Sequence, residues 1–153
     1  MVPRTPQSIE KEHEELHAEL ARAEKAGGST GKAAKAVAEA LLPHFIKEEE
    51  YALPPLGLLS ALASGKISQD MEEAMDMADR LKADLCHMLL EHKAILDALK
   101  ILTEAAETEN KIEFAHFAEK LALHAQNEEE VLYPASMLVG EYLKLKLPQK
   151  ISR

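Results

Sequence analysis

One eleven-residue stretch occurs twice in the chain. Residues 44–54 read HFIKEEEYALP and residues 124–134 read HAQNEEEVLYP, so a His, three successive Glu and a closing Pro stand at identical offsets. In an α-helix, residues four apart lie about 40° apart around the axis and roughly 6 Å apart along it, so both side chains can reach one point. Each copy therefore predicts a His and a Glu that bind the same cation.

The repeat extends upstream of each copy. Glu12-His13 and Glu91-His92 are followed by apolar residues at matching offsets, and each pair precedes the His of its main repeat by nearly the same distance. Each half of the chain thus reads as a hairpin, in which a helix with Glu-His precedes a helix with His-x-x-x-Glu. Two such hairpins predict an all-α fold, an up-down four-helix bundle whose interior collects one ligand group from each helix.

The candidate metal ligands are histidines and the first Glu of each triple. An isolated buried His is usually an ordinary hydrogen-bonded core residue, but here the same neighbours recur around each of four histidines. His17 lies four residues after His13 on the same helical face and is predicted as a fifth imidazole. Imidazole and carboxylate ligands suit iron, manganese or zinc. The predicted metal ligands are His13, His17, His44, Glu48, His92, His124 and Glu128.

Other polar residues near these motifs have simpler interpretations. The second and third Glu of each triple are expected on a solvated face, although Glu129 could replace the first Glu of its triple if the helix is locally wide. His87 and His116 are expected to be ordinary packing or surface residues. Tyr51 and Tyr133 are expected in the core, with their hydroxyl groups hydrogen-bonded at its rim.

Capping residues, prolines and glycines indicate where the helices begin and end. Ser29 or Thr30 is expected to cap the second helix, and Gly27-Gly28 to end the first. A helix of nearly forty residues is long, so a break is expected in the third, between residues 77 and 83. The expected helices run over about 6–26, from the Ser29-Thr30 cap to Pro54, over about 69–107 and from Ile112 to Pro134, with a short tail helix over about 135–147. The bundle core of about 6–133 lies within one domain that covers residues 1–153.

Charge and hydropathy limit the partners. The net charge of −9 and the pI near 5.3 disfavour nucleic acid and anionic membranes, because both repel an acidic surface. The sequence lacks the run of about 20 apolar residues that a membrane helix needs, and its N-terminus lacks the apolar segment of a secretory signal. We therefore expect a soluble cytoplasmic protein. Cys86 is the only cysteine, so no internal disulfide is possible, and its apolar neighbours predict a buried thiol.

The four motifs, in this order and spacing, resemble the hemerythrin-like HHE cation-binding domain. They are Glu-His-x-x-Leu at Glu12, His-x-x-x-Glu-Glu at His44, Glu-His-x-x-Ile at Glu91, and His-x-x-x-Glu-Glu-x-x-x-x-Pro at His124. The resemblance covers residues 8–133. It implies two iron ions in a non-haem di-iron centre with an oxo or hydroxo bridge.

The resemblance also implies a role for each ligand. Glu48 and Glu128 would bridge the two irons, and the terminal imidazoles would be those of the four repeated histidines and a fifth. In oxygen-carrying hemerythrins a His pair on the third helix supplies the fifth imidazole. Here His92 is followed four residues later by Leu96, and His17 is the natural substitute.

An iron with an open position would bind a small molecule such as oxygen, nitric oxide or hydrogen peroxide. The expected function is therefore binding of a diatomic or peroxide ligand for sensing, storage or redox protection. We expect a metal-dependent binding protein rather than a dedicated enzyme. The alternative is a redox enzyme that removes peroxide or nitric oxide, or an iron donor for the repair of iron centres.

Two other metal chemistries match parts of the sequence. Residues 13–17 read His-Glu-Glu-Leu-His, the His-Glu-x-x-His pattern of zinc metallopeptidases, but no third ligand signal or substrate-aligning strand accompanies it. A ferritin-like oxidase would use Glu-x-x-His, which begins at Glu10, Glu14 and Glu113. These positions do not align with the internal repeat.

Overall fold

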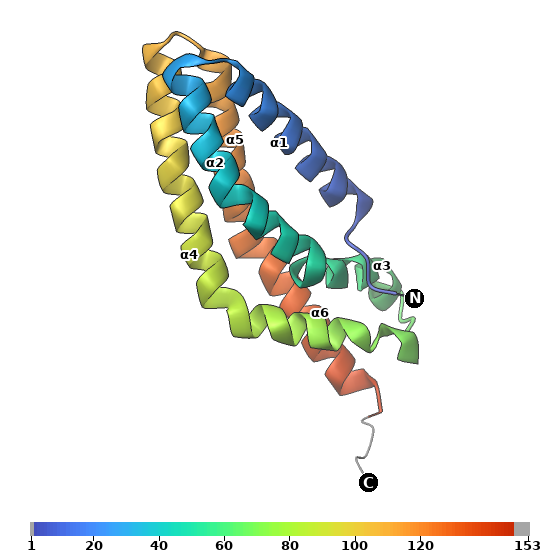
Figure 1. Cartoon of the computed structure of the whole chain (residues 1–153). Helices are drawn as coiled ribbons and strands as arrows, with labels where there is room; N and C mark the ends of the chain where they lie inside the picture. Colours follow the sequence, from blue (N-terminus) through green and yellow to red (C-terminus); the bar gives the residue numbers. More distant parts are fainter. Residues whose placement is uncertain (1, 149–153) are drawn as a thin grey trace.

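Four long helices lie side by side and form the body of the molecule (Figure 1). The computed structural model describes residues 2–148, and within that range it contains helices and no strand. The all-α prediction is confirmed. The long helices are α1 (Gln7–Lys25), α2 (Gly28–Lys47), α4 (Glu73–Thr108) and α5 (Ile112–Asn127).

Shorter elements continue two of these helices and close one end of the bundle. Helices α2 and α5 each run directly into a π-helix, in which the backbone hydrogen bonds span five residues instead of four. The shorter elements are η1 (Glu48–Ala52), η2 (Pro54–Leu58), α3 (Leu59–Ala63), η3 (Gln69–Met71), η4 (Glu128–Leu132) and α6 (Tyr133–Lys146).

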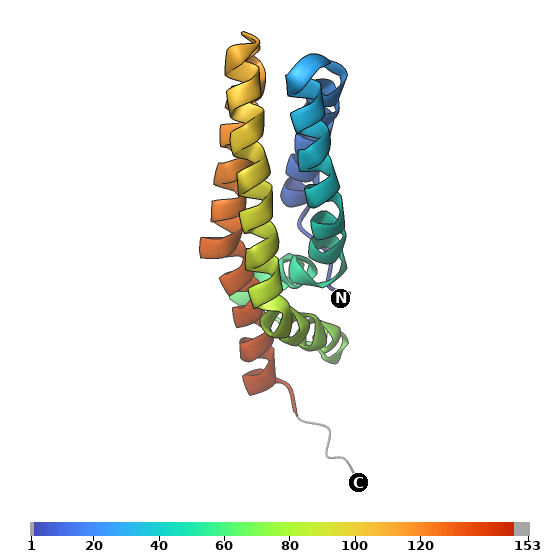
Figure 2. The same cartoon turned by 60° about the vertical axis from the view of Figure 1, so that its left-hand side comes forward.

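Two expected helix ends differ in the structure. Pro134 does not end its helix but lies at the start of α6, where its missing N–H group costs little. The helical path therefore continues from α5 through η4 into α6, with no gap before the expected tail helix. The expected break between residues 77 and 83 is absent as well. Instead α4 is one helix, whose axis turns sharply in its yellow-green part (Figures 1 and 2).

The two inter-helix loops at the far end of the bundle are joined by Glu109. Its carboxylate accepts hydrogen bonds from the backbone N–H of Ser29 (3.2 Å) and of Thr30 (2.6 Å), at the first turn of α2. The side chain that caps α2 thus comes from the other hairpin, and not from Ser29 or Thr30 as expected. Gly28 has φ +62°, a backbone conformation that favours glycine, and a Cβ there would also displace the Glu109 carboxylate, which lies 2.2 Å away.

The hydrophobic core has three parts along the bundle. The first lies among the four long helices and includes Leu16, Val37 and Leu121. The second lies around the π-helices and includes Tyr51 and Tyr133, and the third joins α3, α4 and α6. The polar site described below lies between the first two parts, where all four long helices are still in contact.

The expectation of a buried Cys86 thiol is wrong. Cys86 is exposed and not buried, because it lies on the outer side of α4, next to Leu90, whose side chain is 63% exposed. Among the described residues, no helix is both long and apolar enough to cross a membrane.

Candidate metal centre

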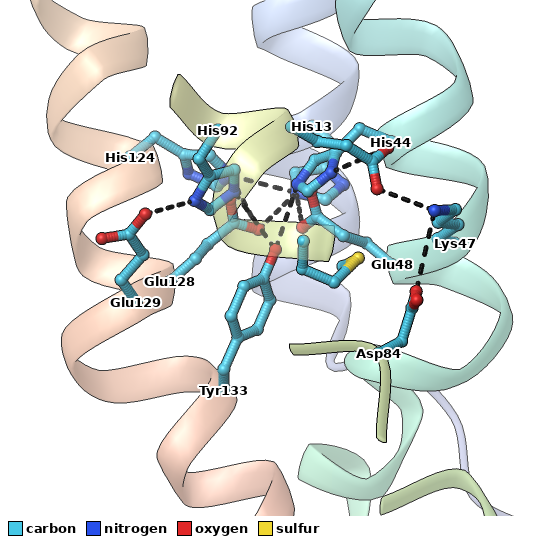
Figure 3. Close-up of polar contacts among 12 residues, drawn as sticks. His13, His44, Lys47, Glu48, Asp84, His92, His124, Glu128, Glu129 and Tyr133 are labelled. Carbon is cyan, nitrogen blue, oxygen red and sulfur yellow. Dashed lines mark hydrogen bonds and ion pairs between the residues drawn. The ribbon is translucent and has the colours of Figure 1, made fainter. Parts of the chain in front are cut away.

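Six buried polar side chains meet in the middle of the bundle (Figure 3). Each long helix contributes one His, and each π-helix contributes its first residue, a Glu. Every one of them is at most 4% exposed. They are His13, His44, Glu48, His92, His124 and Glu128.

The six residues form two groups that share both carboxylates. One group combines His13 and His124 with Glu48 and Glu128, and the other combines His44 and His92 with the same two Glu. Within each group, one ligand atom from every residue lies within 4.8 Å of the others. The buried His and Glu side chains therefore fit a metal site made of two groups. Each group has two imidazoles of its own and the two shared carboxylates.

Burial of the two carboxylates supports a cation between them. Glu48 is 0% exposed and Glu128 is 1% exposed, yet neither forms an ion pair with a Lys or Arg in the described part of the chain. Both oxygens of Glu48 and one oxygen of Glu128 accept no hydrogen bond. A buried carboxylate is strongly disfavoured unless it is paired or binds a metal, so these oxygens have the chemistry of metal ligands.

His13 and His92 are held in their neutral, metal-binding form. Nε2 of His13 lies 3.1 Å from Nε2 of His124, an arrangement that two protonated imidazoles could not adopt. Burial, together with the neighbouring His124, lowers the pKa of His13 to about 3. Burial and the nearby His44 likewise lower the pKa of His92. Neutral imidazole is the form that binds metal ions.

Two carboxylates outside the cluster fix the orientation of two imidazoles. The Nδ1–H of His92 donates to Glu129 (2.9 Å), and the Nδ1–H of His124 donates to Glu12 (2.6 Å). Each bond places the proton on Nδ1 and leaves Nε2 free to face the cluster, as in other carboxylate–histidine–metal arrangements. Glu128, and not Glu129, therefore belongs to both groups, and Glu129 orients His92 from outside.

A third carboxylate approaches His44 but is shared with a lysine. Glu91 lies 3.7 Å from Nδ1 of His44 and 2.7 Å from Nζ of Lys47, whose ammonium group also lies 3.6 Å from Asp84. The hydrogen bond that Lys47 donates to Glu91 raises the pKa of Lys47. Nδ1 of His44 itself has no hydrogen-bond partner. The outer side of His44 is thus flanked by one ammonium group and two carboxylates.

Tyr133 enters the site from below and was not predicted to do so (Figure 3). Its hydroxyl group lies 3.1 Å from Nε2 of His44 and 3.2 Å from Nε2 of His92, the nitrogens that face the cluster. Burial and the charge of Glu48 raise the pKa of Tyr133, so its hydroxyl keeps its proton. In a regular α-helix Tyr133 would point about 140° away from Glu128. Only the π-helix brings both residues to the same side, and the sequence carried no clear signal of it.

His17 is the one predicted ligand that the structure does not place in either group. It is half-buried, and its ring packs edge-on against Phe45, with 4.7 Å between ring centroids. Phe45 in turn stacks on His13 at 4.3 Å. The His-Glu-x-x-His pattern is therefore not assembled around one ion, which leaves the metallopeptidase interpretation without its second ligand.

The remaining polar residues of the motifs lie outside the cluster. Glu49 and Glu50 are exposed, as expected for a solvated face, and His116 is also exposed. His87 is exposed and lies 3.0 Å from Asp84. Tyr51 is buried, and its hydroxyl group donates a hydrogen bond to the same Asp84.

The family follows from this geometry and from a direct comparison. A model of the hemerythrin HHE cation-binding domain matches residues 5–135, which include all six clustered side chains. The chain therefore belongs to the hemerythrin HHE cation-binding domain family. Neither the curated proteins nor the solved structures contain a match to this chain.

Proposed function

We propose that the cluster holds two iron ions and that the protein binds a small diatomic or peroxide ligand at one of them. One ion would be bound by His13 and His124 and the other by His44 and His92, with Glu48 and Glu128 bridging. The observation that carries the proposal is the pair of four-residue groups that share both carboxylates. Two divalent ions close together repel each other, and two shared carboxylates offset that charge.

The donor set leaves room for an exogenous ligand. Each group offers four protein side chains, which is fewer than the six ligands of an octahedral ion. Iron bound in this way supplies redox chemistry and open positions for oxygen, nitric oxide or peroxide. This chain's own contribution is a buried site that keeps its imidazoles neutral. The Tyr133 hydroxyl can donate a hydrogen bond toward the His44–His92 side.

Metal analysis combined with an optical spectrum tests the proposal. The purified protein should hold two irons per chain, one for each group, and absorb in the near ultraviolet. Glu48→Gln should lower the content of both irons, whereas His13→Gln should lower mainly one. Glu130→Gln is the matched control, because Glu130 is exposed and bonded only to Gln126. A single zinc with a featureless spectrum would contradict the proposal.

Oxygen exposure separates a binding role from a redox role. If the protein is a binder, oxygen added to the reduced form should cause a spectral change that reverses when oxygen is removed. Rapid and irreversible oxidation would favour the alternative, a redox enzyme for peroxide or nitric oxide. Iron that leaves readily for a competing chelator would favour an iron donor.

His17 is tested separately because it lies behind Phe45. We expect His17→Leu to leave the iron content unchanged while altering the rate of the small-molecule reaction. The measurements are iron analysis and stopped-flow absorbance on the same preparation. Loss of one iron in His17→Leu would restore His17 as a fifth imidazole ligand, with movement of Phe45 on metal binding.

A further inference from the structure

A cavity opens from the surface onto one half of the metal centre. It has a volume of about 400 Å³ and lies between the N-terminal segment, α1 and η1. We call it the vestibule. The lining residues used below are Arg4, Glu10, His13, Glu14, His17, Glu49 and Glu50.

The vestibule reaches the candidate ligands through His13. This side chain is only 2% exposed, yet it both lines the vestibule and belongs to the His13–His124 group. On its inner side His13 faces the unpartnered carboxylate oxygens of Glu48 and Glu128, at 3.8 and 3.9 Å. A molecule in the vestibule is therefore separated from one metal position by a single imidazole ring.

The internal repeat explains why the opening lies at this corner. In the second half of the chain, Glu129 accepts a hydrogen bond from His92 and covers it from outside. The corresponding pair in the first half is Glu49 and His13, but Glu49 is exposed and forms no such bond within the described residues. The vestibule occupies the place where this fourth carboxylate–imidazole pair would be.

The other half of the centre is covered by Tyr133. Tyr133 lies against Nε2 of both His44 and His92, and its ring is 0% exposed. Its counterpart in the repeat is Leu53, which has no hydroxyl group to place beside His13 and His124. The two halves of a duplicated site are thus unequal, with one covered by Tyr133 and the other facing a cavity.

The vestibule is more negative than positive. Glu10 pairs with Arg4 at 3.6 Å, and Glu50 pairs with an arginine of α4 at 3.3 Å. Glu14 and Glu49 form no hydrogen bond or ion pair within residues 2–148. A cavity lined by one sign of charge raises the local concentration of the opposite charge. Cations are therefore favoured here, neutral molecules are unaffected, and anions are repelled.

We infer that the vestibule is the access route to the His13–His124 half of the centre, and that it admits divalent cations and neutral small molecules in preference to anions. The inference rests on the proposed function for the identity of the small molecule, but its claim about cation access does not. The neutral ligands of the proposed function, oxygen, nitric oxide and hydrogen peroxide, are compatible with this route, whereas anionic ligands are disfavoured.

The route is tested by blocking it in the metal-free protein. Glu14→Cys in a Cys86→Ser background would be labelled with a bulky maleimide, and Co²⁺ uptake followed by absorbance. Uptake should slow severalfold after labelling. Lys35→Cys in the same background is the matched control, because Lys35 is exposed on α2 and outside the vestibule. Equal uptake rates in the two labelled proteins would overturn the route.

The charge selection is tested with two probes on the iron-loaded protein. Glu14→Gln combined with Glu49→Gln should raise the association rate of azide at low salt by up to about tenfold, and leave that of nitric oxide nearly unchanged. Glu104→Gln with Glu107→Gln removes the same charge at the far end of α4 and should change neither rate. If the Glu14→Gln, Glu49→Gln variant changes the association rates of azide and nitric oxide equally, the vestibule does not discriminate against anions.

The two experiments fail independently of the proposed function. If neither azide nor nitric oxide binds, the proposed function is wrong, and Co²⁺ uptake alone decides the route. If both ligands bind but the Glu14 label does not slow Co²⁺ uptake, the proposed function stands and the vestibule is not the route.

Discussion

At the scale of single residues, the centre is held by groups that would destabilise an ordinary core. Glu48 and Glu128 are almost fully buried without a Lys or Arg partner, and three of their four oxygens accept no hydrogen bond. Removal of an unpaired buried polar group typically changes stability by about 1–3 kcal/mol. The same two residues are therefore costly to the metal-free chain, and we expect them to be needed for metal binding.

Glu48→Gln should separate these two effects. In the metal-free protein the neutral amide removes a buried charge, so the free energy of unfolding should rise by about 1–3 kcal/mol. In the presence of iron the same variant should bind less metal. Urea unfolding of the metal-free protein measures the first effect. A lower unfolding free energy in metal-free Glu48→Gln would contradict the prediction.

His13 should make the metal-free protein sensitive to acid. Its pKa in the folded state, about 3, lies below the ordinary value of 6.5. Only the unfolded state takes up this proton as the pH falls below 6.5. The stability contribution is complete above pH 6.5 and is lost progressively towards pH 3, at about 1.4 kcal/mol per pH unit.

Urea unfolding of the metal-free protein at pH 7 and pH 5 measures this dependence. His13→Gln removes the titrating group, so its stability should fall less between the two pH values, by about 1–2 kcal/mol. If the original chain and His13→Gln lose equal stability over this range, His13 does not set the acid sensitivity.

At the scale of elements, both π-helices begin at one of the two buried Glu of the cluster. The backbone N–H of Leu53 donates to the carbonyl of Glu48 at 2.9 Å, five residues earlier, and Tyr133 is bonded to Glu128 in the same way. The wider turn returns Leu53 and Tyr133 to the interior one turn after each Glu. Such turns occur often at functional sites. Here they allow Tyr133 to share the site with Glu128.

The crossing of α4 and α6 depends on one small residue. A Cβ at Gly140 would lie 2.4 Å from the Cβ of Ala78, so Gly140→Ala forces the two helices apart. We expect a loss of about 1–3 kcal/mol in the free energy of unfolding. Thermal or urea unfolding measures it.

The reciprocal change provides the control for this prediction. Ala78→Gly alone should cost about 1 kcal/mol through its effect on helix propensity. Combined with Gly140→Ala it restores the space between the helices, so the double variant should be more stable than the sum of the single effects predicts. If the changes in unfolding free energy simply add, the contact between residues 78 and 140 does not determine how closely α4 and α6 pack.

At the scale of the whole molecule, metal binding should stabilise the bundle, because the ligands come from all four long helices. A ligand at about 100 times its dissociation constant adds about 2.7 kcal/mol to the stability of the folded state. Thermal unfolding with Fe²⁺ or Co²⁺, and again after a chelator, measures this shift. An equal shift in a Glu48→Ala, Glu128→Ala double variant would place the effect elsewhere on the protein.

The duplicated pattern made the helical fold predictable, and it pointed to the six side chains that the structure brings together. Helix periodicity alone puts a His and a Glu four residues later on one side. The position of Tyr133 was not predictable in this way, because a π-turn leaves no mark in residue spacing. His17 has the right spacing from His13, but spacing along one helix cannot show that Phe45 from the next helix fills the space between.

Glu109 has a consequence for how the bundle can open. Together with Lys111, which donates to the carbonyl of Ala26 at 2.9 Å, it ties the loop of one hairpin to the loop of the other. Transient separation of the hairpins should therefore begin at the opposite end, near the vestibule. Amide hydrogens beside these ties should exchange with deuterated solvent more slowly than those of the first turn of α1.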